Sequence, residues 1–234
     1  MRVRSLGWLL AGMSFNLWGG EPPDTQAKEA IVLINHARAN RTEGYFYRAE
    51  AQYRQALAIV EKTSGAQSPD VTAALNGLAE LYCEAGRYSE AEALSRRSAA
   101  VVEASLGSSH PLMATALQDL AAIYHLQGQY GEAEPLYRRA LEIREEALGP
   151  NHPFVAVTLA DLAEMESAQG HYQGAAEHYA RALQIRQDAF GMDDPRVAET
   201  LAGYAAVLRK TCHKHEATLA EARSRSILAK AAFR

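Results

Sequence analysis

The sequence predicts an all-α solenoid of stacked helix–turn–helix repeats. Two series of glycines and one series of prolines recur along the 234-residue chain with the same step of 42 residues. A fixed period of this size is typical of chains in which each unit packs mainly on its neighbours. The positions are Gly65, Gly107, Gly149 and Gly191, then Gly44, Gly86, Gly128 and Gly170, then Pro69, Pro111, Pro153 and Pro195.

The first half of each repeat predicts a helix with one apolar face. In the third repeat, apolar residues recur at helical spacing, which places them on one side: Leu117, Leu120, Ala121 and Tyr124. Pro111 suits the first turn, where its missing N–H would have no partner. Gly128 suits the end, because glycine readily adopts the left-handed conformation that terminates helices.

The second half of each repeat predicts another helix that packs on the first. Its apolar face in the third repeat contains Leu136, Tyr137 and Leu141. A small residue recurs at one position, where it allows close approach of two helices, while aromatic residues fill the space beside it. The small residues are Ala49, Ala91, Ala133, Ala175 and Ala217.

These residues form a recognisable pattern. Leu-x-x-Leu-Ala, then Gly-x-Tyr, then Ala and Tyr-x-x-Ala, resembles the tetratricopeptide repeat, whose usual length is 34 residues. The 42-residue form resembles the long repeats of kinesin light chains and of many bacterial tetratricopeptide proteins, over roughly residues 25–230. The resemblance implies a right-handed α-solenoid whose first helices line a concave groove that binds proteins.

The repeats divide residues 25–234 in sequence. Ser68, His110, His152 and Asp194 precede the repeat prolines and are expected at the starts of the first helices, where Ser and Asp are good caps. A closing helix is expected from Glu216 to about Ala231. The expected repeats span about 25–65, 66–107, 108–149, 150–191 and 192–231.

Residues 1–20 differ from the rest. Arg2 and Arg4 are followed by an uncharged stretch that is short for a membrane span but fits the apolar region of a secretory signal. We expect a signal peptide or N-terminal anchor here and a linker over 21–24, where Pro22 and Pro23 disfavour helix. The protein is then expected to be exported, periplasmic or secreted, and otherwise cytoplasmic.

Composition excludes some classes of function. The chain is 48% hydrophobic and 22% charged, as is ordinary for folded soluble proteins, and its net charge is −4. Loss of residues 1–20 would remove two arginines and no acid, leaving a net charge of −6. A nucleic-acid ligand is not expected for a chain of this charge.

No catalytic, cofactor-binding or metal-binding residue is predicted, and no cofactor is expected. The sequence carries no G-x-S-x-G, no H-E-x-x-H and no phosphate-binding glycine loop. Cys83 and Cys212 lie three repeats apart, roughly 30 Å at a helix-packing distance of about 10 Å per repeat, so no intramolecular disulfide is expected. Cys212, His213 and His215 match no standard zinc spacing. A metal protein or enzyme acting through them is the less favoured alternative.

The groove is the candidate functional site. Positions beside the apolar face of each first helix are expected to face it, including glycines at Gly77 and Gly203 and an acid at Glu199. Polar residues on such a face can hydrogen-bond an extended peptide. The candidates for peptide binding are Asn35, Arg38, Asn76, Glu80, Gln118, Asp119, His125, Asp161, Glu164 and Arg209.

The middle of this groove is expected to be acidic, so the predicted partner is a protein, through a peptide or helix with basic residues. Chaperone-binding relatives use a Lys/Asn/Arg clamp, and kinesin light chains use paired asparagines. Only Asn76 keeps such a residue here, so neither ligand is carried over. Three alternatives remain: these polar residues are merely solvated, terminal repeats stack between chains through Ile31, Val32 and Ile34 as a homo-oligomer, or the N-terminal segment contacts a membrane.

Overall fold

The structure is a computed structural model that describes residues 25–232. The expected signal or anchor at 1–20 and the linker at 21–24 lie outside the described residues. The chain divides into two compact units, Met1–Ser108 (unit 1) and Ser109–Arg234 (unit 2), which are described one at a time.

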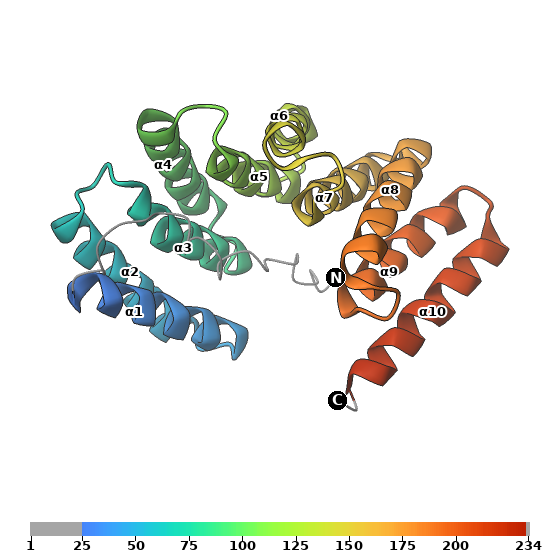
Figure 1. The fold of residues 1–234 in the computed structure, drawn as a ribbon, viewed down its shortest axis with the longest axis horizontal. Coiled ribbons are helices and arrows are strands. Elements are labelled where there is room, and N and C mark those ends of the chain that lie inside the picture. Colours follow the sequence, from blue (N-terminus) through green and yellow to red (C-terminus); the bar gives the residue numbers. More distant parts are fainter. Residues whose placement is uncertain (1–24, 233–234) are drawn as a thin grey trace. The chain divides into compact units, whose positions relative to one another are not determined.

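Unit 1 contains two helical hairpins. The first joins α1 (Thr25–Thr42) to α2 (Phe46–Thr63), and the second joins α3 (Thr72–Glu84) to α4 (Tyr88–Leu106) (Figure 1). A short 3₁₀ turn, η1 (Pro69–Val71), leads into α3. Helix α3 packs on α1 as well as on α2, so each hairpin contributes its first helix to a common layer.

Unit 2 contains three helical hairpins. Helices α5, α7 and α9 form one layer, since α7 contacts both of the others, and each packs on the helix that follows it (Figure 1). We use the term A-face for the surface of α5, α7 and α9 that the helices α6, α8 and α10 do not cover. The helices are α5 (Pro111–Leu126), α6 (Tyr130–Leu148), α7 (Pro153–Gln169), α8 (Tyr172–Phe190), α9 (Pro195–Lys210) and α10 (Lys214–Ala232).

The predicted helix boundaries depend on local capping. The Nδ1 atoms of His110 and His152 accept hydrogen bonds from the backbone N–H two residues on, and Asp194 Oδ1 does the same. These contacts satisfy amide groups that have no partner in the first turn. Gly128 ends its repeat's first helix with a φ of 74°, as expected. The closing helix α10 begins two residues before the predicted Glu216.

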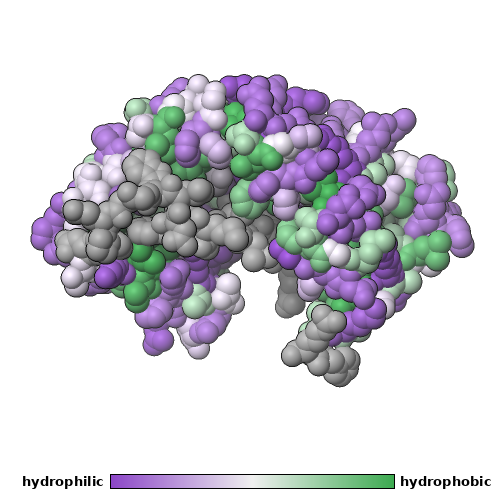
Figure 2. All heavy atoms as spheres, viewed as in Figure 1, coloured by the Kyte–Doolittle hydropathy of each residue, from purple (hydrophilic) through white to green (hydrophobic). Residues whose placement is uncertain are grey.

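The core consists of the predicted apolar faces. In unit 2 one cluster joins α5, α6 and α7 through buried residues that include Leu120, Tyr137 and Leu162. The predicted all-α fold class is confirmed. Figure 2 shows hydrophilic and hydrophobic side chains intermixed over the visible surface. Within residues 25–232, every helix is too short or too polar to cross a membrane.

Candidate functional site

A buried arginine organises the polar residues of unit 2. Arg144 on α6 is only 1% exposed, although it lies on a helix face that is otherwise apolar. Its Nη1 donates hydrogen bonds to Thr158 Oγ1 at 2.5 Å, to the Phe154 carbonyl at 3.2 Å and to Gln118 Oε1. Burial lowers the pKa of Arg144 to about 10, which leaves it charged at neutral pH. The guanidinium thus links α5, α6 and α7.

Gln118 connects this hydrogen-bond network to a buried carboxyl group. Its Nε2 donates a hydrogen bond of 2.6 Å to Asp161 Oδ2 on α7. Burial raises the pKa of Asp161 to about 7, and the nearby carboxylate of Glu164 raises it further, whereas Arg144 and Arg186 oppose the shift. Asp161 Oδ1 makes no hydrogen bond to any residue between 25 and 232. Within the described residues, one oxygen of the Asp161 carboxyl therefore accepts a hydrogen bond, and the other does not.

Two exposed acids lie near Asp161. Glu164 follows it by one turn of α7, and Glu199 on α9 lies 3.5 Å from Nη1 of Arg186. Loss of water around the carboxyl and the charge of Glu199 both raise the pKa of Glu164. This region therefore contains four acidic residues but only two buried arginines, Arg144 and Arg186. The acidic residues are Asp119, Asp161, Glu164 and Glu199. The A-face therefore carries an excess of negative charge.

Tyr137 completes the surroundings of Asp161. The residue is fully buried, and its Oη has no hydrogen-bond partner within the described part of the chain. Burial raises the pKa of the phenol well above its ordinary value, and the carboxylates of Asp161, Glu164 and Asp119 raise it further. A buried hydroxyl without a partner costs free energy. The Tyr137 hydroxyl therefore lies within electrostatic reach of the acids but makes no hydrogen bond to them.

The next repeat has an equivalent buried arginine, but the residues around it differ. Arg186 on α8 donates to Thr200 Oγ1 at 2.7 Å and to the Arg196 carbonyl at 3.0 Å, as Arg144 does one repeat earlier. However, Ala160 stands where Gln118 stood, and Gly203 stands where Asp161 stood. A Cβ added at Gly203 would lie 2.7 Å from Cζ of Tyr179. The ring fills the space that the carboxyl occupies in the other repeat.

The structure corrects the expected exposure of three candidates. Gln118, Asp119 and Asp161 were expected to face an open groove, but they are only 6%, 4% and 8% exposed. Gln118 and Asp161 are buried because they bond to each other and, through Gln118, to Arg144. Gly77 and Gly203 are likewise packing positions, under Tyr53 and Tyr179.

Sequence reasoning missed Arg144, Arg186 and Tyr137 as parts of the site. The two arginines recur 42 residues apart on apolar helix faces, and Tyr137 and Tyr179 recur with the same step. A charged residue repeated on a core face is a signal that could have revealed the network, because buried charge requires polar partners.

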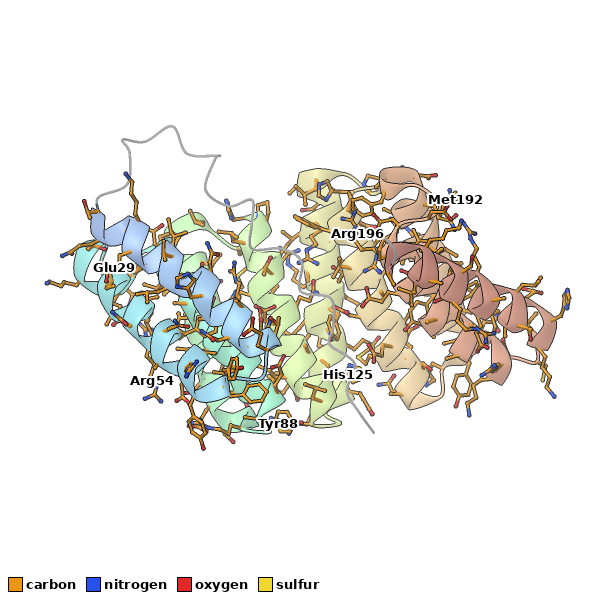
Figure 3. The ribbon with its side chains drawn as sticks, turned by 90° about the horizontal axis from the view of Figure 1, so that it is seen from below. Glu29, Arg54, Tyr88, His125, Met192 and Arg196 are labelled. Carbon is orange, nitrogen blue, oxygen red and sulfur yellow. The ribbon has the colours of Figure 1, made fainter. Side chains whose placement is uncertain are left out.

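The other candidates of unit 2 lie elsewhere. His125, at the end of α5, is half-buried beside Tyr130, and burial lowers its pKa. It lies at the opposite end of the helices from Arg196, which is in the first turn of α9 (Figure 3). Arg209 is exposed and donates a 2.6 Å hydrogen bond to Glu221 of α10. Glu164 is the exposed candidate beside Asp161, and neither His125 nor Arg209 joins them.

The four candidates of unit 1 form a separate group. Glu80 pairs with Arg41 at 2.8 Å, and burial raises its pKa to about 7. Arg38 lies close enough to Glu80 to influence that pKa. Asn76 is half-buried with Oδ1 lacking a partner in the described chain, and Asn35 is exposed. Glu80 is therefore neutralised locally by arginines.

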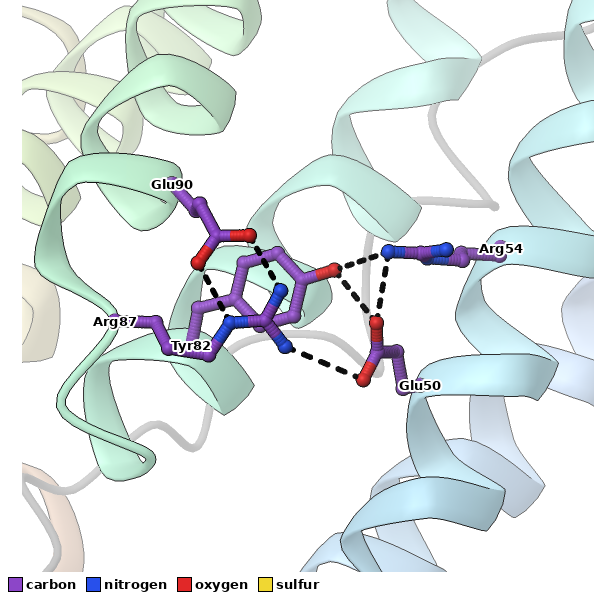
Figure 4. Close-up of polar contacts among 5 residues, drawn as sticks. All are labelled: Glu50, Arg54, Tyr82, Arg87 and Glu90. Atoms are coloured by element: carbon purple, nitrogen blue, oxygen red, sulfur yellow. Dashed lines mark hydrogen bonds and ion pairs between the residues drawn. The ribbon is translucent and has the colours of Figure 1, made fainter.

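A second polar cluster of unit 1 is structural. Tyr82 donates to Glu50 at 2.8 Å and accepts from Arg54 at 2.9 Å, while the Arg87 guanidinium lies 3.9 Å from its ring centroid (Figure 4). Arg87 also pairs with Glu90. These contacts join α2, α3 and α4, and they give the Tyr82 hydroxyl both a donor and an acceptor.

The metal alternative gains no geometric support. Cys212 is exposed, with a φ of 65° at the position of the helix-ending glycines, and His213 contacts Thr211. No group of three or more His, Cys, Asp or Glu residues that could hold a metal ion occurs among residues 25–232.

Comparisons with known proteins give a consistent result. The tetratricopeptide repeat family model matches residues 28–104, 70–146 and 112–188. The kinesin light chain TPR-like repeats of Podosopora anserina are 24% identical, with a TM-score of 0.70, over 91% of this chain and all of that one. BtubC from P. vanneervenii is 22% identical, with a TM-score of 0.70, over 89% of this chain and 92% of that one.

PilF of Pseudomonas aeruginosa is also similar, at 18% identity and a TM-score of 0.62, over 87% of this chain and 78% of that one. No curated protein matches the sequence. The structural similarities establish the fold, and the family model covers well over half of the chain. The predicted resemblance is confirmed: this chain belongs to the tetratricopeptide repeat family.

Proposed function

We propose that the protein is a non-catalytic scaffold and that the A-face of unit 2 is a groove for a basic peptide or helix of a protein partner. Tetratricopeptide repeats in general mediate protein–protein interaction. The observation that carries the proposal is the excess of acids on this face, where Glu164 and Glu199 are exposed beside Asp161. Complementary charge favours encounter with a basic segment and disfavours an acidic one.

The buried network supports this role by fixing the acids in place. Arg144 and Gln118 hold the side chain of Asp161 between α5, α6 and α7. Rigid positioning lowers the entropy lost when a ligand binds. Because α5, α7 and α9 present similar positions at regular intervals, an extended segment can contact them in succession.

Selection from a peptide library displayed to the full chain tests the proposal. The variant carries Glu164→Lys and Glu199→Lys, and the control carries Glu146→Lys and Glu177→Lys, which are exposed positions on α6 and α8. All four residues are exposed, but Glu199 also pairs with the buried Arg186, so thermal melting must first show that the Glu164/Glu199 variant is folded. Both proteins then differ from wild type by the same net charge.

We expect selected peptides to be rich in Lys or Arg, to bind wild type and the control, and to lose binding to the Glu164/Glu199 variant. Enrichment of acidic peptides, or equal binding by both variants, would exclude the A-face as a site for basic segments. A library that yields no binder would refute peptide recognition itself.

A further inference from the structure

An arginine recurs at one position on the second helices of the repeats. Arg181 on α8 donates a hydrogen bond of 2.6 Å to Glu145 on α6 and one of 3.0 Å to the Pro150 carbonyl. In unit 1, Arg97 on α4 pairs with Glu61 on α2 in the same way. An arginine here therefore ties its helix to a carboxylate near the end of the preceding second helix. The column follows the 42-residue step through Arg97, Arg139, Arg181 and Arg223.

The arginine of the closing helix lacks this carboxylate. Gln187 stands where Glu145 stood, and Arg223 on α10 makes no ion pair with any residue between 25 and 232. Its Nη2 instead lies 3.1 Å from Sδ of Met192 and 3.4 Å from the Met192 carbonyl. A thioether sulfur is only a weak acceptor. The Arg223 guanidinium therefore faces a sulfur atom where its equivalents face a carboxylate.

Met192 is accessible to solvent, unlike the other methionines of unit 2. It lies in the connection between α8 and α9, at the same end of the helices as Arg196 (Figure 3), and is 58% exposed. Met113 and Met165 are only 8% and 0% exposed. A dissolved oxidant must reach the sulfur atom in order to react with it. Among the methionines of residues 25–232, Met192 is therefore the one that such an oxidant reaches first.

We propose that Met192 is a site of reversible oxidation by a peroxide, and that the sulfoxide oxygen accepts a hydrogen bond from Arg223. A lone pair of Sδ attacks one peroxide oxygen, so that an S–O bond forms and the O–O bond breaks. The hydroxide that leaves takes the proton of the transferred oxygen and departs as water. The sulfur is oxidised and the peroxide is reduced. The modification does not depend on a ligand of the A-face.

Oxidation would strengthen the attachment of the closing helix. The sulfoxide is polar, and its oxygen accepts hydrogen bonds better than the thioether sulfur does. A hydrogen bond from a guanidinium is charge-assisted and therefore stronger than a neutral one. The oxidised side chain would thus give Arg223 the acceptor that Gln187 does not provide, and it would join the α8–α9 connection to α10. Because α10 packs on α9, the same contact supports one edge of the A-face.

Treatment of the full chain with hydrogen peroxide tests the proposal. Mass spectrometry of peptides should show that Met192 gains one oxygen at least about tenfold faster than Met113 and Met165. Amide hydrogen exchange in peptides from α10 should slow by about threefold or more after oxidation. Two folded variants are the controls. Met192→Leu keeps every other methionine, and Arg223→Gln keeps Met192 without the guanidinium, so peroxide should leave exchange in α10 unchanged in both.

Each measurement can overturn one part of the proposal. Equal rates of oxidation at Met192 and at the buried methionines would refute a selective site. Unchanged or faster exchange in oxidised wild type, or equal slowing in Arg223→Gln, would refute the hydrogen bond from Arg223. Equal slowing in Met192→Leu would assign the effect to another methionine. A methionine sulfoxide reductase should return the exchange rate of oxidised wild type to its original value, and its failure to do so would contradict reversibility.

Discussion

Tyr137 and Tyr179 occupy equivalent positions on α6 and α8, yet their surroundings differ. Tyr137 faces a buried carboxyl, whereas Tyr179 lies over a glycine. The arginine about two helical turns further along is the same in both repeats and makes the same two contacts to the following helix. The comparison teaches that this repeat keeps its arginine framework while the residue beside the tyrosine varies between a carboxyl and a glycine.

The largest expected effect comes from removing the framework arginine. Arg144→Met leaves Gln118 and Thr158 without their charged partner inside the core, which should cost about 3–5 kcal/mol. Arg186→Met should cost less, about 2 kcal/mol, because Arg186 is more exposed and has no glutamine partner. Urea denaturation followed by circular dichroism measures both, and an equal cost would refute the difference between the two repeats.

The space under Tyr179 should tolerate no side chain. Gly203→Ala places a Cβ 2.7 Å from the ring, and such overpacking costs about 1–3 kcal/mol. Gly131→Ala is the matched control, since nothing lies within 4 Å of its added Cβ and alanine favours helix by about 1 kcal/mol. Thermal melting should therefore move in opposite directions for the two variants; a rise for Gly203→Ala would show that Tyr179 moves freely.

Asp161→Asn should stabilise the protein at alkaline pH. The folded pKa of about 7 lies above the ordinary 3.8, so the folded state binds the proton more tightly, and ionisation costs stability as pH rises through this window. The variant should equal wild type near pH 4 and exceed it by about 2 kcal/mol at pH 8. Urea midpoints across pH measure this, with exposed Asp188→Asn as the control. A constant difference between Asp161→Asn and wild type would contradict the raised pKa.

The partly exposed cluster of unit 1 should contribute least. Tyr82→Phe removes two hydrogen bonds, to Glu50 and from Arg54, but Arg54 is largely exposed and both partners keep their ion pair. We expect a loss of about 1 kcal/mol or less, measured by thermal melting. A loss as large as that of Arg144→Met would show that solvent access does not separate the two networks.

Sequence periodicity predicted the helices and their ends because those depend on local residues. His110 and Asp194 bond to amide groups two positions away, so their role follows from position alone. The burial of Gln118 and Asp161 could not be predicted in this way. Their partners lie 26 and 43 residues distant along the chain, and a polar residue beside an apolar face looks solvated until its partner is known.

The pH dependence of peptide binding tests the central claim most directly. A basic peptide selected from the library would be titrated at pH 6 and pH 8 into wild type and Asp161→Asn. Because the pKa of Asp161 is about 7, wild-type affinity should rise severalfold over this range, while the affinity of the variant should change little. An equal pH response in wild type and Asp161→Asn would contradict the binding of a basic segment beside Asp161.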